Sequence, residues 1–242
     1  MKKIRDGLIL GSGRSGTSML AGTLSAAGYY IGDCLIEANE ANPKGFFEDY
    51  EVNAINEELL TPLTPRFEYG WRWLASVDVG TPIPSVSWLD DRMATLTSKS
   101  PFCFKDPRLC YTLPVWRPFL SDTVFLCIFR EPARTANSIV TECRTAKYLS
   151  GFPMDFQRAI EVWTLMYRHI LTVHRHIGDW LFLHYDQLVN GAVNDTLEEL
   201  LGVNVTRTFA DVQLKRSPCE GNVSPMALDV YRELCTLAHY PA

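Results

Sequence analysis

The stretch that decides the fold is Ile9-Leu10-Gly11-Ser12-Gly13-Arg14-Ser15-Gly16-Thr17-Ser18-Met19-Leu20. The apolar run 7–10 is typical of a buried strand, and apolar residues at helical spacing from Met19 onward predict a helix. A strand, a glycine-rich loop and a helix together form an anion site. The glycines let backbone N–H groups turn inward, and the helix N-terminus adds a partial positive charge. Phosphate is the expected ligand.

The loop departs from the nucleotide-binding pattern G-x-x-x-x-G-K-[ST] at one position. Thr17 stands where that pattern has the lysine that reaches the β- and γ-phosphates. The cation of the loop is Arg14, two residues before the second glycine. This is a poor fit to ATP or GTP chemistry, and the alternative is an ordinary Gly/Ser turn between strand and helix. As a phosphate site, the loop would bind through residues 11–18: Gly11, Ser12, Gly13, Arg14, Ser15, Gly16, Thr17 and Ser18.

Length and composition favour one α/β domain over residues 1–242, with 47% hydrophobic residues. The formal net charge of −5 argues against a nucleic-acid partner. No stretch reaches the ~18 apolar residues of a membrane span, and the start of the chain reads as no export signal. Seven scattered cysteines without a C-x-x-C pair predict a reduced, cytoplasmic protein, and no metal site is expected.

Buried runs that alternate with helical segments predict a parallel sheet with helices on both faces. The segment 61–87 holds four prolines and predicts a long surface excursion, of the kind that forms an acceptor wall or a lid. Strands are expected at 7–10, 102–105, 124–129 and 180–184. Helices are expected near 19–27, before 60, and at 85–98, 131–145, 154–177, 185–201 and 226–237.

Three predicted strands end in cations. The first leads into the Arg14 loop, the second ends in Lys105 and Asp106, and the third ends in Arg130. Ligands of open α/β sheets bind beyond the carboxyl ends of the strands, so these cations are expected to meet in one crevice. Ser138, eight residues after Arg130, is expected to share an anion with that guanidinium. Two separate anion sites, at Arg14 and at Arg130 with Ser138, suggest a nucleotide phosphorylated at both its 5′ and 3′ ends.

At these residues the chain resembles the sulfotransferases that use 3′-phosphoadenosine 5′-phosphosulfate (PAPS). Residues 11–18 resemble their 5′-phosphosulfate loop, and Arg130-Glu131-Pro132 with Ser138 is similar to their 3′-phosphate motif. The segments 42–49 and 105–109 resemble bacterial sulfotransferases in particular. His184-Tyr185-Asp186-Gln187-Leu188 is similar to a run that lies near the adenine, which implicates Tyr185 in donor binding. The resemblance spans residues 7–201.

The resemblance implies a P-loop-like domain of three layers that transfers a sulfuryl group from PAPS to a hydroxyl or amine without a metal. The acceptor would be a small molecule, carbohydrate or lipid, and the product 3′,5′-adenosine bisphosphate. Arg14 and Lys105 would lie at the transferring group. Two alternatives stay open: a P-loop kinase of small molecules, and a nucleotide-binding module without activity. The oligomeric state is also open.

Two features of the cytosolic sulfotransferases are missing. Their K-x-H segment provides a histidine base, but here Lys105 is followed by Asp106 and Pro107. Their C-terminal R-K-G run is absent, and the segment 215–217 is a weak substitute for it.

Glu48 is the expected general base. The run 45–47 before it gives it an apolar collar at a helix entrance, and Asp106 is the second candidate. The alternative roles for Glu48 are to cap that helix or to pair with a cation such as Lys105.

Overall fold

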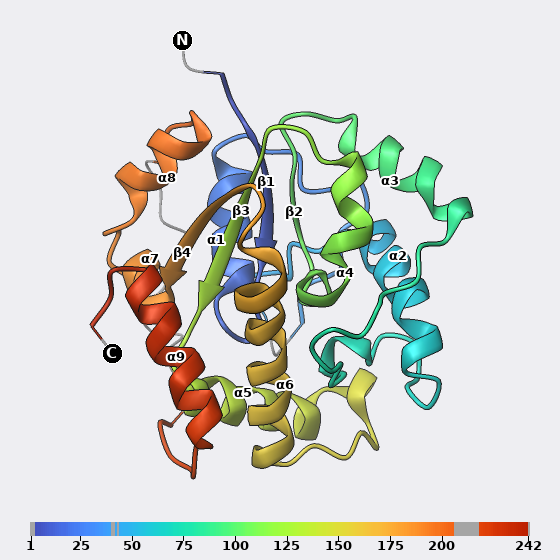
Figure 1. Cartoon of the computed structure of the whole chain (residues 1–242), viewed down its shortest axis with the longest axis vertical. Helices are drawn as coiled ribbons and strands as arrows, with labels where there is room; N and C mark the ends of the chain where they lie inside the picture. Colours follow the sequence, from blue (N-terminus) through green and yellow to red (C-terminus); the bar gives the residue numbers. More distant parts are fainter. Residues whose placement is uncertain (1–2, 40–41, 43, 206–217, 242) are drawn as a thin grey trace.

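The computed structural model describes residues 3–39, 42, 44–205 and 218–241 (Figure 1). Its centre is a parallel sheet in the order β2-β1-β3-β4. The strands are β1 (Asp6–Leu10), β2 (Cys103–Lys105), β3 (Thr123–Phe129) and β4 (Asp179–His184). In the register, Leu8 of β1 stands between Phe104 of β2 and Phe125 of β3. The predicted α/β class with a parallel sheet flanked by helices is confirmed.

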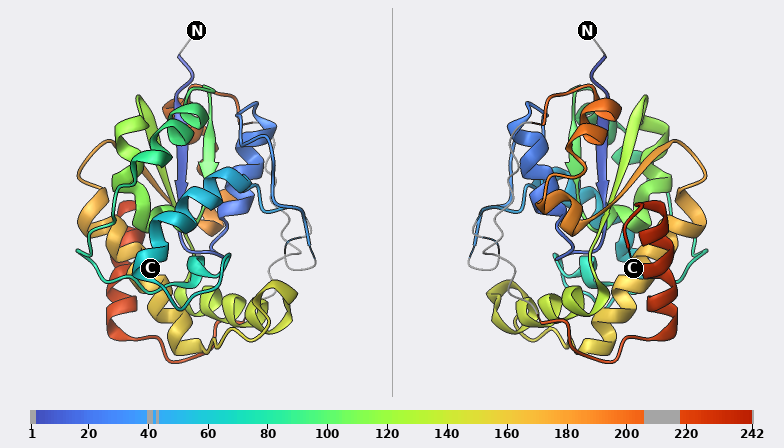
Figure 2. Two further views of the ribbon diagram at one scale, coloured as in Figure 1. Left: turned by 90° about the vertical axis from the view of Figure 1, so that its right-hand side faces the viewer. Right: turned by 90° about the vertical axis from the view of Figure 1, so that its left-hand side faces the viewer.

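Helices cover both faces of this sheet (Figures 1 and 2). Alternate residues of a strand point to opposite faces, so Leu8 and Leu10 belong to one core and Ile9 to the other. The larger core lies against α2 (Tyr50–Leu60), α3 (Asp90–Thr97), α4 (Leu109–Trp116), α5 (Pro132–Thr145), α6 (Phe156–His169) and α9 (Pro225–Leu237). The smaller core lies against α1 (Thr17–Ala26), α7 (Tyr185–Val189) and α8 (Asn194–Leu201).

The strand order places the sequence-predicted cations on neighbouring strands. Lys105 ends β2, the Arg14 loop follows β1, and Arg130 follows β3, and these three strands are adjacent. The chain leaves β1 toward β2 on one side and leaves β3 toward β4 on the other, so the connections diverge between β1 and β3. Helix α5 lies beyond the carboxyl ends of the strands, at the bottom of both figures. The site is therefore bounded by the strand ends and α5.

The sequence did not predict α4. This helix is buried almost all round, so it shows no polar stripe, and Pro114 stands inside it. A proline in a helix leaves the carbonyl four residues earlier without its N–H donor. That carbonyl, Cys110 O, instead contacts Nε2 of His174 at 2.9 Å. A distant histidine thus supplies the hydrogen bond that the local sequence cannot.

Three expected elements were wrong in detail. The helix expected at 185–201 is two helices, α7 and α8, separated by a turn that contains Gly191 in a left-handed conformation. The helix expected at 154–177 ends as α6 at His169 and continues as a π-helical turn, Ile170–His174. Trp88, expected on the apolar side of the helix at 85–98, is 71% exposed, and the α-helical part of that segment begins at Asp90.

The segment 61–87 contains only short 3₁₀ turns, at Thr61–Leu63 and Arg72–Leu74. It is less superficial than expected, because Trp73, Leu74, Ala75 and Val77 are all buried in the larger core. Tyr111 of α4 holds this segment, because its hydroxyl donates a hydrogen bond to Ala75 O at 2.8 Å. The segment is therefore a packed wall rather than a free excursion. None of the helices described here is both long and apolar enough to cross a membrane.

Candidate active site

The loop between β1 and α1 is shaped by two glycines in positive-φ conformations. Gly11 has φ 151° and Gly16 has φ 98°. A Cβ at Gly11 would lie 2.3 Å from Ile128 O, and one at Gly16 would lie 2.6 Å from the Tyr185 ring. Gly16 is the N-cap of α1, which has no side-chain cap and no acidic residue in its first turn. The N-terminus of α1 therefore keeps its partial positive charge for a ligand.

The hydroxyl residues of the loop are mostly buried. Ser12 donates its backbone N–H to the Tyr167 hydroxyl at 3.2 Å, which ties the loop to α6. Ser15 is fully buried, and its hydroxyl makes no hydrogen bond with the described residues. Thr17, at the position of the missing lysine, is buried as the first residue of α1. Ser18 accepts a hydrogen bond from Asn42 at 3.0 Å.

Arg14 joins the loop to α5. It has a positive φ of 68°, which is unusual for a residue with a side chain. Its Nε donates to Ser138 Oγ at 3.0 Å and lies 3.2 Å from Glu142 Oε2. The two expected anion sites are therefore linked by a direct contact. Ser138, which the sequence assigns to the Arg130 site, contacts Arg14 of the other.

Arg130 is a buried cation with unused hydrogen-bond donors. It is 7% exposed, and neither its Nε nor its Nη2 has a hydrogen-bond partner among the described residues. Its guanidinium lies 4.6 Å from the centre of the Tyr185 ring, and that ring also packs against Gly16. Burial lowers the pKa of Arg130 from its usual value. A buried guanidinium with free donors is expected to bind an anion, because leaving them unpaired costs free energy.

Lys105 and Glu48 form a buried ion pair. Lys105 is 3% exposed and Glu48 is 8% exposed, and Lys105 Nζ donates to Glu48 Oε1. Glu48 does not cap α2. Asp49 does, because its carboxylate accepts the N–H groups of Glu51 and Val52. Of the two alternatives considered for Glu48, the ion pair is observed and the cap is not.

A pocket of about 330 Å³ brings the three candidate catalytic residues together, because Arg14, Glu48 and Lys105 all line it. The loop contributes Gly13 and Thr17 to the same wall. Aromatic side chains from four segments complete it: Phe46, Tyr50, Tyr69, Trp73 and Tyr148. Arg130 and Ser138, expected at the 3′-phosphate of the donor, and Tyr185, expected near its adenine, are not lining residues of this pocket.

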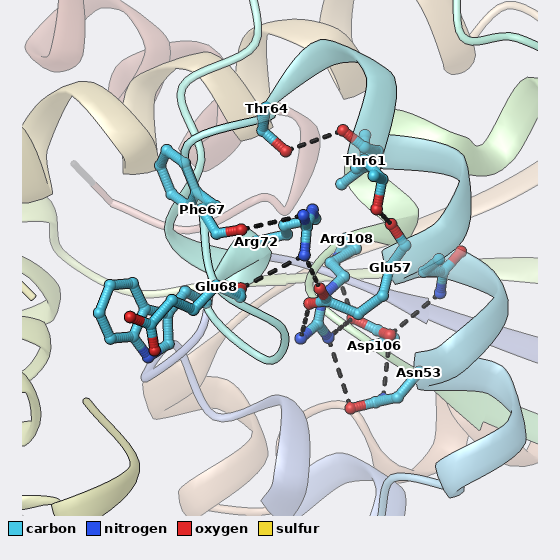
Figure 3. Close-up of polar contacts among 12 residues, drawn as sticks. Asn53, Glu57, Thr61, Thr64, Phe67, Glu68, Arg72, Asp106 and Arg108 are labelled. Carbon is cyan, nitrogen blue, oxygen red and sulfur yellow. Dashed lines mark hydrogen bonds and ion pairs between the residues drawn. The ribbon is translucent and has the colours of Figure 1, made fainter. Parts of the chain in front are cut away.

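Both carboxylate oxygens of Asp106, the second candidate base, already accept hydrogen bonds from the protein. It is fully buried, and Oδ2 accepts hydrogen bonds from the amides of Asn53 and Asn56, each at 3.0 Å. Oδ1 accepts from the backbone N–H and from Nη1 of Arg108, at 2.8 and 2.9 Å. Figure 3 shows Asp106 enclosed in this network with Arg108 and Glu57. These four hydrogen bonds favour a structural role for Asp106 over that of a base.

The similarity of this chain to known proteins lies in its fold. No family model matches the chain, and no curated protein matches it. The sulfotransferase domain from the Synechococcus PCC 7002 olefin synthase matches with a TM-score of 0.52 and 19% identity, over 97% of this chain and 93% of that one. The sulfotransferase domain from the curacin biosynthetic pathway matches with a TM-score of 0.55 and 13% identity, over 100% of this chain and 99% of that one. The chain has a sulfotransferase fold.

Within this sulfotransferase fold, sequence reasoning missed several residues of the site. Glu142 and Tyr148 line the pocket from α5 and the turn after it, and Glu57 lines it from α2. Tyr167 holds the loop from α6. The local sequence pattern identifies no polar contact for any of these side chains. The one available signal was a glutamate on α5 one helical turn after Ser138, on the same side of the helix.

The described residues include no group of three or more His, Cys, Asp or Glu side chains that could hold a metal ion. The segment 215–217, considered as a contact for the 3′-phosphate, lies outside the residues that the structure describes.

Proposed function

We propose that the protein is a sulfotransferase that takes a sulfuryl group from PAPS and transfers it to a hydroxyl or amine of a small acceptor. The observation that carries this proposal is Arg130, a buried guanidinium with two unpartnered nitrogens. It is joined through Tyr185 to the glycine loop. A donor with anionic groups at both ends matches one anion site at the loop and another at Arg130.

The chain's own residues fit such a donor. The N-terminus of α1 and the backbone of residues 11–18 suit the 5′ end, and Arg130 suits the 3′-phosphate. Tyr185 lies between them, with Gly16 on one side and Arg130 on the other. The donor supplies a sulfuryl group whose bond to the phosphate oxygen breaks as a bond to the acceptor oxygen or nitrogen forms, with release of 3′,5′-adenosine bisphosphate.

Glu48 is the base in this proposal. Its Oε1 accepts a hydrogen bond from the Lys105 ammonium, and its other oxygen accepts no hydrogen bond from the described residues. That second oxygen is available to accept the proton of the acceptor hydroxyl. Lys105 and Arg14 would then meet the negative charge that develops on the sulfuryl oxygens and on the leaving phosphate. Positioning and charge stabilisation account for most of the catalysis in the related phosphoryl transfer reactions.

The pocket is suited to a compact acceptor. Its volume of about 330 Å³ is at the lower end for small-molecule sites, and its aromatic side chains offer apolar surface. The charged side chains of Arg14, Glu48 and Lys105 line the same pocket. An acceptor that packs against the aromatic rings therefore has its polar group close to these charges. We expect a small molecule, or the end of a carbohydrate or lipid chain, rather than an extended polymer.

The test is a comparison of nucleotides. Calorimetry without added magnesium is expected to show that 3′,5′-adenosine bisphosphate binds much more tightly than AMP or ATP. Tighter binding of ATP would favour the alternative of a P-loop kinase. Turnover of PAPS with an acceptor library then separates an enzyme from a nucleotide-binding module without activity.

A further inference from the structure

Glu142 is a buried carboxylate in the pocket wall to which the proposed chemistry gives no role. It is 3% exposed on α5, and it lines the same pocket as Arg14, Lys105 and Glu48. Burying a carboxylate costs several kcal/mol unless other groups compensate its charge. The partners of Glu142 therefore indicate why it is there.

The first partner is Arg14. Ser138 and Glu142 are four residues apart on α5, so they lie on one side of the helix one turn apart. The Nε of Arg14 donates a hydrogen bond to Ser138 Oγ at 3.0 Å and lies 3.2 Å from Glu142 Oε2, an ion pair without a hydrogen bond. The two α5 side chains thus hold one end of the guanidinium, while the positive φ of Arg14 fixes the direction in which its side chain leaves the loop.

The second partner is Tyr148, which donates its hydroxyl to Glu142 Oε1 at 2.8 Å. Tyr148 is itself anchored, because its carbonyl accepts a hydrogen bond from the indole of Trp71 at 2.8 Å. Burial, followed by the charge of Glu142, raises the pKa of Tyr148, so its hydroxyl stays protonated and continues to donate. The hydrogen bond from Tyr148 therefore fixes one oxygen of the Glu142 carboxylate, and the other oxygen lies next to Arg14.

We propose that Glu142 is a positioning residue, which fixes the Arg14 guanidinium at the boundary between the donor loop and the acceptor pocket. This inference rests on the proposed function. A long side chain on a loop has many rotamers, and ordering it during the reaction would cost entropy. With Glu142 and Tyr148 in place, the order exists before the donor binds. The benefit appears where Arg14 meets developing charge, in the transition state.

The test uses inorganic vanadate, which adopts the five-coordinate geometry of an in-line transfer. Vanadate binding is measured by vanadium NMR on protein saturated with 3′,5′-adenosine bisphosphate. Glu142→Gln keeps the size of the side chain and removes its charge. We expect the bisphosphate to bind within about threefold of wild type and vanadate to bind about tenfold more weakly, since only the latter probes the transition-state geometry.

The decisive arm is the same substitution in an Arg14→Ala background. A positioning residue acts through Arg14, so Glu142→Gln is expected to cause no further loss of vanadate binding there. A merely structural role would give the same additional loss in both backgrounds. The control is Glu161→Gln, which makes the same charge change at an exposed position of α6 outside the pocket. It is expected to change neither measurement.

If Glu142→Gln has a lower melting temperature than the wild type, the same measurements are made on Tyr148→Phe. This variant leaves the charge of Glu142 in place and removes the hydrogen bond that holds it. We expect a smaller loss of vanadate binding, again absent when Arg14 is alanine. Unchanged vanadate binding in the folded variant overturns the positioning role while the bisphosphate still binds. Failure of the wild type to bind the bisphosphate overturns the proposed function itself.

Discussion

Arg14 Nε donates a hydrogen bond to Ser138 Oγ at 3.0 Å, across 124 residues of sequence. Arg14 belongs to the loop after β1, and Ser138 lies on the helix that follows Arg130. The hydrogen bond therefore connects the two positions that the sequence assigns to opposite ends of the donor. Binding at one end is expected to affect the other, because the two residues share a contact.

This connection predicts that Arg14 and Ser138 are energetically coupled. In a double-mutant cycle with Arg14→Ala and Ser138→Ala, the losses of bisphosphate affinity should be non-additive by at least about 0.5 kcal/mol. Calorimetry on the four proteins measures the coupling. Simple addition of the two losses would mean that the contact has no part in donor binding. Thr141→Ala, an exposed hydroxyl on the same helix, serves as the control.

Arg130→Ala should weaken donor binding selectively. The substitution removes a buried charge-assisted contact and should cost about 1.5–3 kcal/mol of bisphosphate binding. The loss should be much smaller for 5′-AMP, which has no 3′-phosphate. The ratio of the two dissociation constants is the measurement. An equal loss for both nucleotides would show that Arg130 does not bind the 3′-phosphate.

Glu48→Gln should lower turnover far more than it lowers bisphosphate binding. Glutamine keeps the size of the side chain and can still accept a hydrogen bond from Lys105, but it cannot take the proton of the acceptor. We expect kcat to fall ~100-fold or more with little change in bisphosphate binding. Steady-state kinetics with the acceptor found in the library measure this. A kcat within a few-fold of wild type would remove Glu48 from the role of base.

Asp106→Asn should act on stability instead. Each oxygen of Asp106 accepts two hydrogen bonds, and an amide group in its place would direct N–H groups at donors already present. Breaking a buried charged network of this kind costs about 3–5 kcal/mol. Urea unfolding measures the loss. A variant of wild-type stability that is nevertheless inactive would restore Asp106 as the candidate base.

Two buried histidines should make the protein less stable in mild acid. Burial lowers the pKa of His174 from 6.5 to about 4, and burial also lowers the pKa of His169. Below pH 6.5 these histidines bind protons in the unfolded chain but remain neutral in the folded protein. The stability contributed by neutral His174 is therefore complete above that pH and falls as the pH drops toward 4, by up to about 1.4 kcal/mol per pH unit, and His169 acts in the same direction. Urea unfolding at pH 7.5 and pH 5 measures the difference.

His174→Gln is the matching variant, because its amide can still donate to Cys110 O without titrating. Its stability should depend less on pH over the same range than that of the wild type. An identical pH dependence in both proteins would show that His174 is not the group responsible.

The sequence predicted what depends on local pattern. Apolar runs located the strands, and the rule for carboxyl ends of parallel strands predicted the adjacent positions that Arg14, Lys105 and Arg130 occupy. Only two of the three meet in the pocket, since Arg130 turns toward Tyr185. Which way a side chain turns from a shared edge depends on its neighbours in space.

The parts that the sequence missed depend on distant partners. Helix α4 tolerates Pro114 because His174 contacts the carbonyl that the proline leaves without a donor, 64 residues away from Cys110. Glu142 is buried because Arg14 and Tyr148 reach it, although a glutamate on an amphipathic helix is usually solvated. No local rule shows either contact.

The position of Trp73 against Gly13 limits how this protein can change its acceptor. A Cβ at Gly13 would lie 2.5 Å from the Trp73 ring, so the aromatic wall rests directly on the backbone of the donor loop. A substitution at Trp73 that reshapes the pocket also removes support from the loop. Tyr69, on the same wall but 69% exposed, has no such tie. New acceptor specificity is therefore more accessible, in evolution or in engineering, through Tyr69 than through Trp73.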